Sequence, residues 1–339
     1  MPRLIQLRHA SHPDTRRVAL VADPHLQLLD GVDSVYALAQ AAIAQRTPLS
    51  VLVQALATAD RLPYDPIYEG TDAEWRLLPP IDHPGEPARC LVTGTGLTHI
   101  GSARDRQAMH LQQQTAEPQT DSMRMFQAGL DGGRPAAGQI GTAPEWFYKG
   151  TGLTLRAHGE PLTSPPFAED AGEEAEIAGL YVIDAAGMPH RVGMAVGNEL
   201  SDHRYERRNY LHLAGSKLRE CAIGPELVLA PDFHHVPGEA WIERGPDIIW
   251  RKRIASGDDN MSHSLLNLEH HHFKYPLHRR PGDVHVHFFG AHSLSFGEGV
   301  SLAGGDVMAI RFDGFGRALR NTLRVDPSGD RLVTVSALG

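Results

Sequence analysis

Three glutamates have the types and spacing of a metal site. Glu174 and Glu176 stand one residue apart in GEEAEIAGLYVID, and Glu199 follows in VGMAVGNELSDHRYE. On a β-strand, side chains at positions i and i+2 point to the same face about 6.6 Å apart, so one cation can contact both carboxylates. Such oxygen donors suit Mg²⁺, Mn²⁺ or Ca²⁺. The same pattern is also typical of a solvated sheet face, and spacing alone leaves both interpretations open.

A β-hairpin is expected to bring the third glutamate to the first two. The stretch LYVIDAAGMPHRVGMAV has two apolar runs on either side of Ala185-Ala186-Gly187, which predicts two strands and a turn. If the hairpin is symmetric about Ala186 and Gly187, Glu174 faces Glu199 across it. Three carboxylates would then converge on one point.

Composition and charge narrow the class of protein. The 339 residues are 41% hydrophobic and 22% charged, which is typical of a globular protein. The formal charge of -9 argues against a nucleic-acid or anionic-membrane partner, because both need a basic face. Two cysteines give no disulfide framework, and no long apolar run or signal-peptide core appears. We expect a cytoplasmic protein that is neither exported nor inserted in a membrane.

The pattern along the chain predicts an α+β protein with two domains. Residues 1–88 read as a small α+β domain, with strands at 4–7 and 18–21, a helix starting at Asp33-Ser34 and a second helix over 49–59. Residues 89–339 form the larger domain. Its expected helices are GSARDRQAMHLQQQ and TDSMRMFQAGL, and its expected strands cover 177–183, 191–197, 226–230, 239–243, 248–254, 284–289 and 306–312.

Motifs in four places resemble the fumarylacetoacetate hydrolase superfamily, and its GguC-type branch in particular. They are Glu174-Ala175-Glu176-Ile177, Asn198-Glu199-Leu200-Ser201, Lys217 followed by Gly224-Pro225, and a closing set that contains Pro281-Gly282-Asp283, Gly290, Gly305-Asp306, Asp313-Gly314-Phe315-Gly316 and Asn321. A glutamate replaces the usual aspartate at 199, and the interval from Lys217 to Gly224-Pro225 is about two residues short.

The resemblance implies a fold, a metal and an oligomer. The fold is a small N-terminal domain followed by a mixed β-sandwich or β-roll that carries the site, usually as a homodimer. The implied ligands of one Mg²⁺, or of a similar ion, are Glu174, Glu176 and Glu199. Three carboxylates leave about three positions of an octahedron free, and the carboxylate and keto oxygen of a 2-oxo acid fill two of them.

One departure from the family pattern bears on the reaction. The hydrolases carry Gly-x-Asn-Tyr-x-x-His-x-x-Glu, whose histidine and glutamate activate water. The matching segment here runs from Gly96 to Asp105, with Ser102 in place of the histidine and Asp105 in place of the glutamate. His99 is three positions early. Because serine is no base near neutral pH, the resemblance favours hydration, dehydration or decarboxylation of 2-oxo acids over carbon-carbon hydrolysis.

Four residues are the catalytic candidates. Lys217 is the candidate base or the contact for the substrate carboxylate, because a lysine beside a buried cation can exchange protons near neutrality; the alternative is a surface lysine. Thr98 and Ser102 lie on a glycine-flanked turn and could donate to a substrate oxygen or cap a helix. Asp105, which replaces the glutamate of the dyad, completes the set.

Substrate contacts are expected from three further residues. Lys149 resembles a family position near the cavity, against the alternative of a loop lysine that passes aromatic neighbours. Arg219 could pair with the substrate carboxylate or a ligand glutamate, or form a structural salt bridge. His292 falls where the family has a loop of small residues around the cavity.

The twenty histidines offer a second metal hypothesis. Treated as strand residues, only the pairs His270/His272 and His285/His287 could share a zinc ion, and neither cysteine partners nor an HExxH motif accompany them. We therefore expect most histidines to be surface or dimer-contact residues.

The sequence thus predicts a Mg²⁺-dependent lyase that dehydrates a 2-keto-3-deoxy sugar acid in sugar-acid breakdown. The first alternative is a C–C hydrolase of 2,4-diketo acids or acylpyruvates, with a different base in place of the dyad. The second is a 2-oxo-acid-binding protein without catalytic activity.

Overall fold

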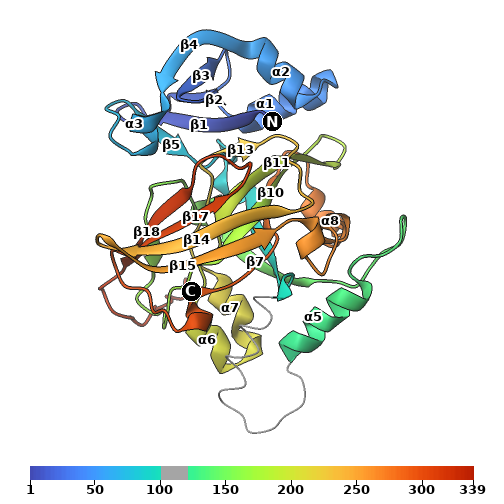
Figure 1. Ribbon diagram of the computed structural model, residues 1–339, viewed down its shortest axis with the longest axis vertical. Helices are drawn as coiled ribbons and strands as arrows, with labels where there is room; N and C mark the ends of the chain where they lie inside the picture. Colours follow the sequence, from blue (N-terminus) through green and yellow to red (C-terminus); the bar gives the residue numbers. More distant parts are fainter. Residues whose placement is uncertain (101–120) are drawn as a thin grey trace.

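A computed structural model describes residues 1–100 and 121–339 (Figure 1). Within this part of the chain the strands form two mixed sheets. The larger sheet follows the order β4-β3-β2-β1-β13-β11-β10-β16-β6-β7, with β5, β8 and β12 paired at its side, and the smaller one follows β15-β14-β17-β18-β9. The predicted α+β class is confirmed.

The strands are β1 Arg3–His9, β2 Arg16–Ala22, β3 His25–Leu29, β4 Ala57–Pro63, β5 Trp75–Leu78, β6 Cys90–Gly96, β7 Glu145–Thr151, β8 Leu155–Arg156, β9 Leu162–Ser164, β10 Ala175–Ile183, β11 Pro189–Asn198, β12 Cys221–Ile223, β13 Leu227–Val228, β14 Val236–Arg244, β15 Asp247–Ser256, β16 Val284–Phe288, β17 Val307–Phe312 and β18 Leu319–Val325. The helices are α1 Val35–Gln45, α2 Leu49–Leu56, α3 Tyr64–Tyr68, α5 Asp121–Gly132, α6 His203–Arg208, α7 Leu213–Lys217 and α8 Leu265–Phe273. Short 3-10 turns include η5 Pro276–Arg279 and η6 Ser295–Glu298.

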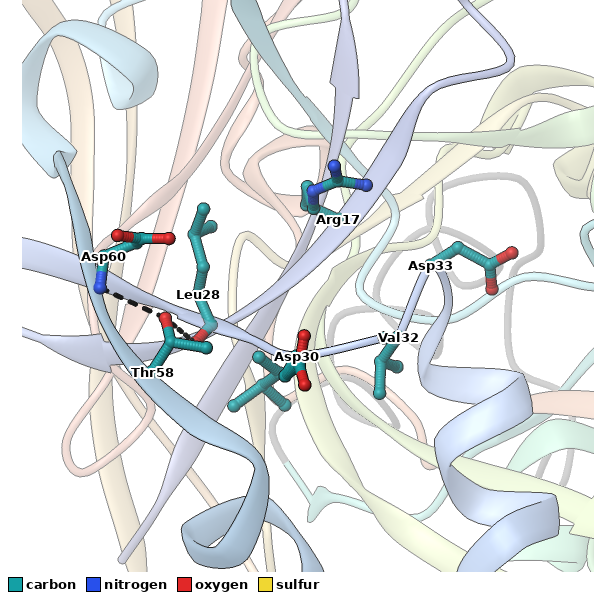
Figure 2. A pocket seen from close by; sticks show the side chains of 9 residues that line it. Arg17, Leu28, Asp30, Val32, Asp33, Thr58 and Asp60 are labelled. Carbon is teal, nitrogen blue, oxygen red and sulfur yellow. Dashed lines mark hydrogen bonds between the residues drawn. The ribbon is translucent and has the colours of Figure 1, made fainter.

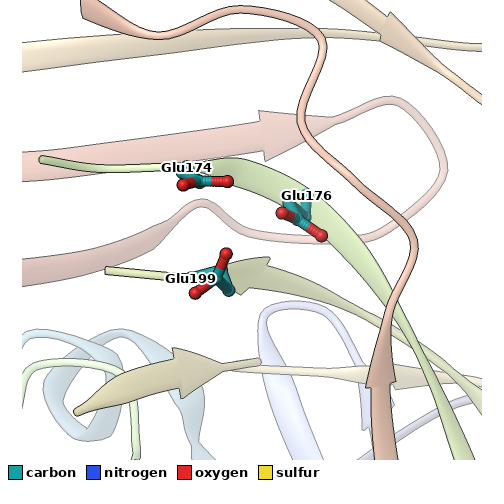
Figure 3. Close-up of side chains that lie close together, drawn as sticks. All are labelled: Glu174, Glu176 and Glu199. Atoms are coloured by element: carbon teal, nitrogen blue, oxygen red, sulfur yellow. The ribbon is translucent and has the colours of Figure 1, made fainter. Parts of the chain in front are cut away.

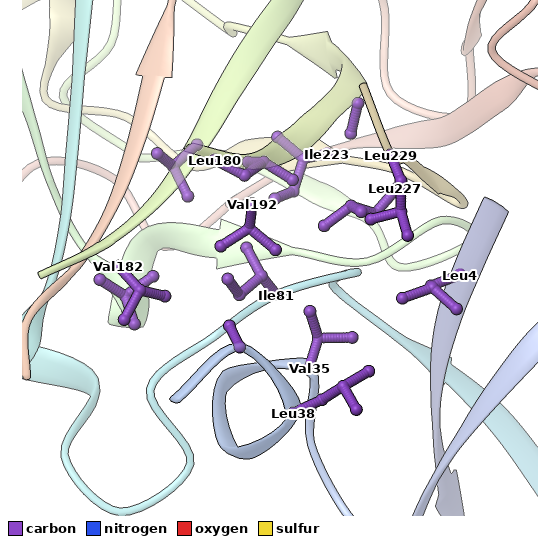
Figure 4. Packing of buried hydrophobic residues seen from close by; sticks show 14 of the residues in the cluster. Leu4, Val35, Leu38, Ile81, Leu180, Val182, Val192, Ile223, Leu227 and Leu229 are labelled. Carbon is purple, nitrogen blue, oxygen red and sulfur yellow. The ribbon is translucent and has the colours of Figure 1, made fainter. Parts of the chain in front are cut away.

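The central strand β10 is buried along its whole length and has a core on each face. Leu180 and Val182 point to the side where Val35 and Leu38 of α1 pack (Figure 4). Ile177 points to the other side and joins a cluster that contains residues of the smaller sheet, Ile310 among them. A strand covered on both faces is uniformly apolar, which explains the unbroken hydrophobic run that predicted it.

The N-terminal unit has its own small core and is also joined to the larger sheet. Ile5, Leu26 and Tyr64 are among the residues of that core. Strand β1 pairs with β13, so one strand order runs from β4 into the centre of the protein. The domain boundary at residue 88 stays a prediction. A cleft of about 430 Å³ lies in the N-terminal unit, and its lining residues, which fall between positions 17 and 60, include acidic side chains and Arg17 (Figure 2).

Several expected elements are confirmed and one is wrong in its extent. Helix α1 begins after Ser34, whose hydroxyl accepts a hydrogen bond from the backbone N–H of Ala37. The second helix ends at Leu56, whereas residues 57–59 belong to β4, which pairs with β3. Neither β3 nor β4 was expected from the sequence. The segment ATADRLP, which forms β4, has no buried residue and lacks apolar alternation. Helix α5 confirms the helix expected in TDSMRMFQAGL, and the other expected helix, GSARDRQAMHLQQQ, lies outside the described residues.

The expectation that most histidines lie on the surface is wrong for a group around β16. His272, His278, His285 and His287 are all buried, and His272 belongs to the helix α8 rather than to a strand. The rings of His272 and His287 stack 4.4 Å apart, and His272 Nε2 lies 2.9 Å from His285 Nδ1. Burial lowers the pKa of His285 and of His287 to about 3.

This histidine group makes folding stability depend on acid. Since the pKa values of His285 and His287 are lower in the folded chain than the ordinary value near 6.5, the unfolded chain binds more protons below that pH. Stability should therefore fall as the pH drops from about 6.5 toward 3, by up to about 1.4 kcal/mol per pH unit for each group. His287→Asn, which can keep the hydrogen bond to Thr93, should remove one such contribution. Urea unfolding at pH 7.5, 6 and 5 measures the slope, and equal slopes for both proteins would contradict this account.

Candidate metal centre

The hairpin brings the three glutamates together as expected. Ala175 lies opposite Asn198 on β10 and β11, and the N–H of Glu199 donates to the carbonyl of Glu174 over 3.0 Å. One carboxylate oxygen of each of Glu174, Glu176 and Glu199 lies within 4.8 Å of the others (Figure 3). All three side chains are buried. The alternative of a solvated sheet face is therefore wrong.

Glu176 is held in a way that leaves one oxygen for a ligand. The N–H of Gly290 donates to its Oε2 over 2.7 Å. Its Oε1 is buried and has no hydrogen-bond partner among the described residues. A buried unpaired carboxylate oxygen beside two further carboxylates is costly, and a divalent cation would satisfy all three. The residues present thus fit a Mg²⁺-type ion.

Two buried lysines partly balance the carboxylates. Lys217 Nζ donates to Glu174, to Glu199 Oε2 over 2.7 Å and to Ser201 Oγ over 3.0 Å. Lys149 Nζ lies 2.6 Å from Glu199 Oε1. Both side chains are fully buried, so neither the surface lysine nor the loop lysine considered from the sequence is observed.

The electrostatics of these groups favour an added positive charge. Three carboxylates against two ammonium groups leave a net charge of -1 when all five are ionised. Burial and the charges of Glu199 and Glu174 raise the pKa of Glu176 well above its ordinary value. Burial and Glu174 also raise the pKa of Glu199, against the opposing effect of Lys149 and Lys217. A divalent cation would keep these carboxyl groups ionised.

Strand β7 contributes a row of side chains that the sequence interpretation only partly found. Glu145, Phe147 and Lys149 alternate with exposed residues and are all buried. The Phe147 ring lies 4.7 Å from Lys217 Nζ, and Glu145 accepts a hydrogen bond of 2.9 Å from the Tyr210 hydroxyl. At a β-bulge in β7, Lys149 has no paired residue on β6. Such a bulge changes the direction in which a side chain points. The sequence signal that could have identified Glu145 and Phe147 was their i, i+2 spacing with Lys149.

The structure gives other contacts to the remaining candidates. Thr98 Oγ1 donates to the carbonyl of Phe289 over 2.6 Å. Arg219 pairs with Asp202 over 3.0 Å, which is the structural salt bridge rather than a pair with a ligand glutamate. His292 Nδ1 donates to the carbonyl of Ala255 over 3.1 Å. Ser102 and Asp105 lie outside the described residues.

One contact of the site was not found from the sequence. His203, the first residue of α6, lies with its Nε2 3.1 Å from Glu174 Oε1. It follows the Asn198-Glu199-Leu200-Ser201 motif by two positions. Its proximity to a metal-ligand candidate depends on the chain turning back after β11, which no local pattern predicts.

The fold is that of several solved structures, a fumarylacetoacetate hydrolase among them, which confirms the fold that the resemblance implied. A 2-keto-3-deoxy-D-arabinonate dehydratase complexed with magnesium and 2,5-dioxopentanoate is similar over 96% of this chain and 99% of its own, with 18% identity and a TM-score of 0.69. A fumarylacetoacetate hydrolase from Exiguobacterium antarcticum is similar over 96% of this chain and 100% of its own, with 17% identity and a TM-score of 0.58. A 2-hydroxyhepta-2,4-diene-1,7-dioate isomerase from Mycobacterium marinum is similar over 97% of this chain and 100% of its own, with 14% identity and a TM-score of 0.57.

No protein-family model and no curated protein matches the chain. Among its described helices, none is long and apolar enough to cross a membrane. The cytoplasmic location and the homodimer stay predictions.

Loading the centre with Mg²⁺ or Mn²⁺ should stabilise the protein. At a free metal concentration of 100 times Kd, the expected gain is about 2.7 kcal/mol in the free energy of unfolding. Because the pKa of Glu176 is raised, protons compete with the metal and the gain should shrink from pH 7.5 to pH 5.5. Thermal unfolding of chelator-treated protein with and without metal measures it. Glu176→Gln should abolish the gain, and a variant that is stabilised as much as the unaltered protein would contradict the assignment.

Proposed function

We propose that this protein is a divalent-metal-dependent dehydratase of a 2-keto-3-deoxy sugar acid. The observation that carries the proposal is the buried glutamate trio with two lysines bonded to it. A 2-keto-3-deoxy sugar acid suits this centre, because its carboxylate and C2 keto oxygen are adjacent hard donors. Its negative charge would also complement the divalent cation that the centre would hold.

Two further observations favour dehydration over hydrolysis. The dehydratase with bound magnesium superposes on this chain with a TM-score of 0.69, whereas the hydrolase and isomerase reach 0.58 and 0.57. The water-activating histidine of the hydrolase motif is replaced by Ser102 in the sequence. The first observation concerns the shape of the fold and the second the available bases, so they support the proposal independently.

Glu174, Glu176 and Glu199 would hold the metal, for which Mg²⁺ is the first choice and Mn²⁺ or Ca²⁺ the alternatives. When bound, it would supply Lewis-acid polarisation of the C2 carbonyl, which acidifies the C3 proton. Loss of water then requires two proton transfers by the protein: removal of the C3 proton and protonation of the departing C4 hydroxyl.

We assign these transfers to Lys217 and Glu145. Beside the bound cation the ammonium group of Lys217, which lies between Glu174 and Glu199, would lose its proton, and the free amine would then take the C3 proton. Glu145 is a buried carboxyl group on the same face of β7 as Phe147, whose ring contacts Lys217. In its acid form it gives its proton to the C4 hydroxyl, which leaves as water. The electron pair of the broken C3–H bond becomes the second bond between C3 and C4, the pair of the C4–O bond leaves with the water, and one proton returns from Lys217 to Glu145 to complete the cycle.

Product analysis tests the reaction. Protein loaded with Mg²⁺ or Mn²⁺ is incubated with 2-keto-3-deoxy pentonates and hexonates and with acylpyruvates, and products are identified by mass spectrometry. A single product lighter by one water supports the proposal. Two carbon fragments from an acylpyruvate would establish the hydrolase instead, and metal-dependent pyruvate binding without turnover of any compound would establish the non-catalytic binding protein.

Glu145→Gln should lower kcat by about 10²- to 10⁴-fold, since it removes an acid-base group but retains an acceptor for Tyr210. Mn²⁺ affinity should not change, because Glu145 is no ligand. Glu269→Gln is the matched control: Glu269 accepts a hydrogen bond of 2.9 Å from Tyr181 in the same way, on the helix α8, which contributes none of the residues assigned to the glutamate centre. If both variants keep full kcat, Glu145 has no role in proton transfer.

A further inference from the structure

A buried histidine contacts the carboxylate of Glu174 from the side of α6. His203 is 2% exposed and its Nε2 lies 3.1 Å from Glu174 Oε1. Its position is fixed by the start of the helix, where the side chain of Asp202 accepts a hydrogen bond of 3.0 Å from the N–H of Tyr205. The imidazole therefore reaches the carboxylate from an element separate from the hairpin that carries Glu174.

Gly172 has no side chain, and this leaves the space that the imidazole of His203 occupies. A Cβ atom on Gly172 would lie 2.2 Å from His203 Nδ1, so a larger residue at 172 would displace the imidazole. Gly172 is also tied to Ser201 by two backbone hydrogen bonds of 2.9 and 3.0 Å. The Phe296 ring also contacts the imidazole, with ring centroids 5.2 Å apart. The ring is thus wedged between fixed neighbours.

The hydrogen-bond pattern assigns the proton. A carboxylate oxygen only accepts, so His203 Nε2 carries the hydrogen. His203 Nδ1 is buried without a hydrogen-bond partner in the described part of the chain. A buried nitrogen without a hydrogen-bond partner is costly, and an apolar side chain of the same shape would avoid that cost. The Nε2–H bond to Glu174 is what a histidine provides here and an apolar residue does not.

Two donors converge on one oxygen of Glu174. Lys217 Nζ, at the end of α7, donates to the same Oε1 that His203 contacts from α6. Donors from two elements thus hold this oxygen of Glu174 from two directions. Groups that orient a metal ligand in this way typically change metal affinity by 10- to 100-fold when they are removed.

We propose that His203 is a positioning residue of the metal centre, whose Nε2–H holds Glu174 in the orientation that binds the divalent cation. The inference rests on the proposed metal site but not on the identity of the substrate. It also accounts for Gly172, because only glycine leaves room for the ring.

Mn²⁺ titration of the metal-free protein, followed by calorimetry and by the electron paramagnetic resonance of free Mn²⁺, tests the proposal. His203→Gln places an amide N–H near the Nε2 position and should bind Mn²⁺ within about threefold of the unaltered protein. His203→Asn places its amide near the Nδ1 position, out of reach of Glu174, and should lose about 10- to 100-fold in affinity. Both are polar amides, so a general loss of packing would affect them alike.

His158→Leu is the control, because His158 is a buried histidine that is hydrogen-bonded to the carbonyl of Tyr68 and not to the glutamates. It should bind Mn²⁺ like the unaltered protein. Equal affinities for the Gln and Asn variants overturn the positioning role. Failure of the unaltered protein to bind Mn²⁺ overturns the metal site and the inference with it, whereas Mn²⁺ binding without dehydration of any sugar acid overturns only the proposed function.

Discussion

Repulsion among three buried carboxylates is the constraint on which the site depends. Glu174, Glu176 and Glu199 approach within 4.8 Å in the protein interior, where like charges interact strongly. Lys217 and Lys149 reduce the repulsion, and the N–H of Gly290 stabilises the carboxylate of Glu176 by a hydrogen bond. These contacts still leave an excess of negative charge. A centre built in this way is poised for a divalent cation, and the folded chain holds the carboxylates together in advance.

The scaffold supplies the rigidity that this arrangement needs. Strand β10 is packed on both faces, by α1 and α2 on one side and by the smaller sheet on the other. Its hairpin with β11 sets the register that pairs Glu174 with Glu199. Lys149 and Lys217 come from β7 and from the end of α7, so separate segments meet at one carboxylate cluster. Displacing any one of these elements would leave a charge buried without its partner.

The sequence predicted what short-range patterns determine. The hairpin, the glutamate trio and the strands that were expected follow from i, i+2 spacing and from apolar runs, and these are observed, whereas strands without such runs, such as β3 and β4, were missed. Contacts between distant segments could not be predicted in the same way. His203 reaches Glu174 only because the chain turns back after β11, and His285 and His287 are buried because α8 covers β16. Glu145 was missed although its alternation with Phe147 was visible in the sequence.

The central claim is that Glu174, Glu176 and Glu199 together hold one divalent cation that a 2-oxo acid can reach. A crystal structure with Mn²⁺ and oxalate, a non-reacting mimic of the 2-oxo acid group, tests it most directly through the anomalous scattering of manganese. The account predicts a single strong peak at bonding distance from all three carboxylates, with one oxygen of each oxalate carboxylate on the metal. A manganese peak elsewhere, or none at this centre under saturating Mn²⁺, would contradict it.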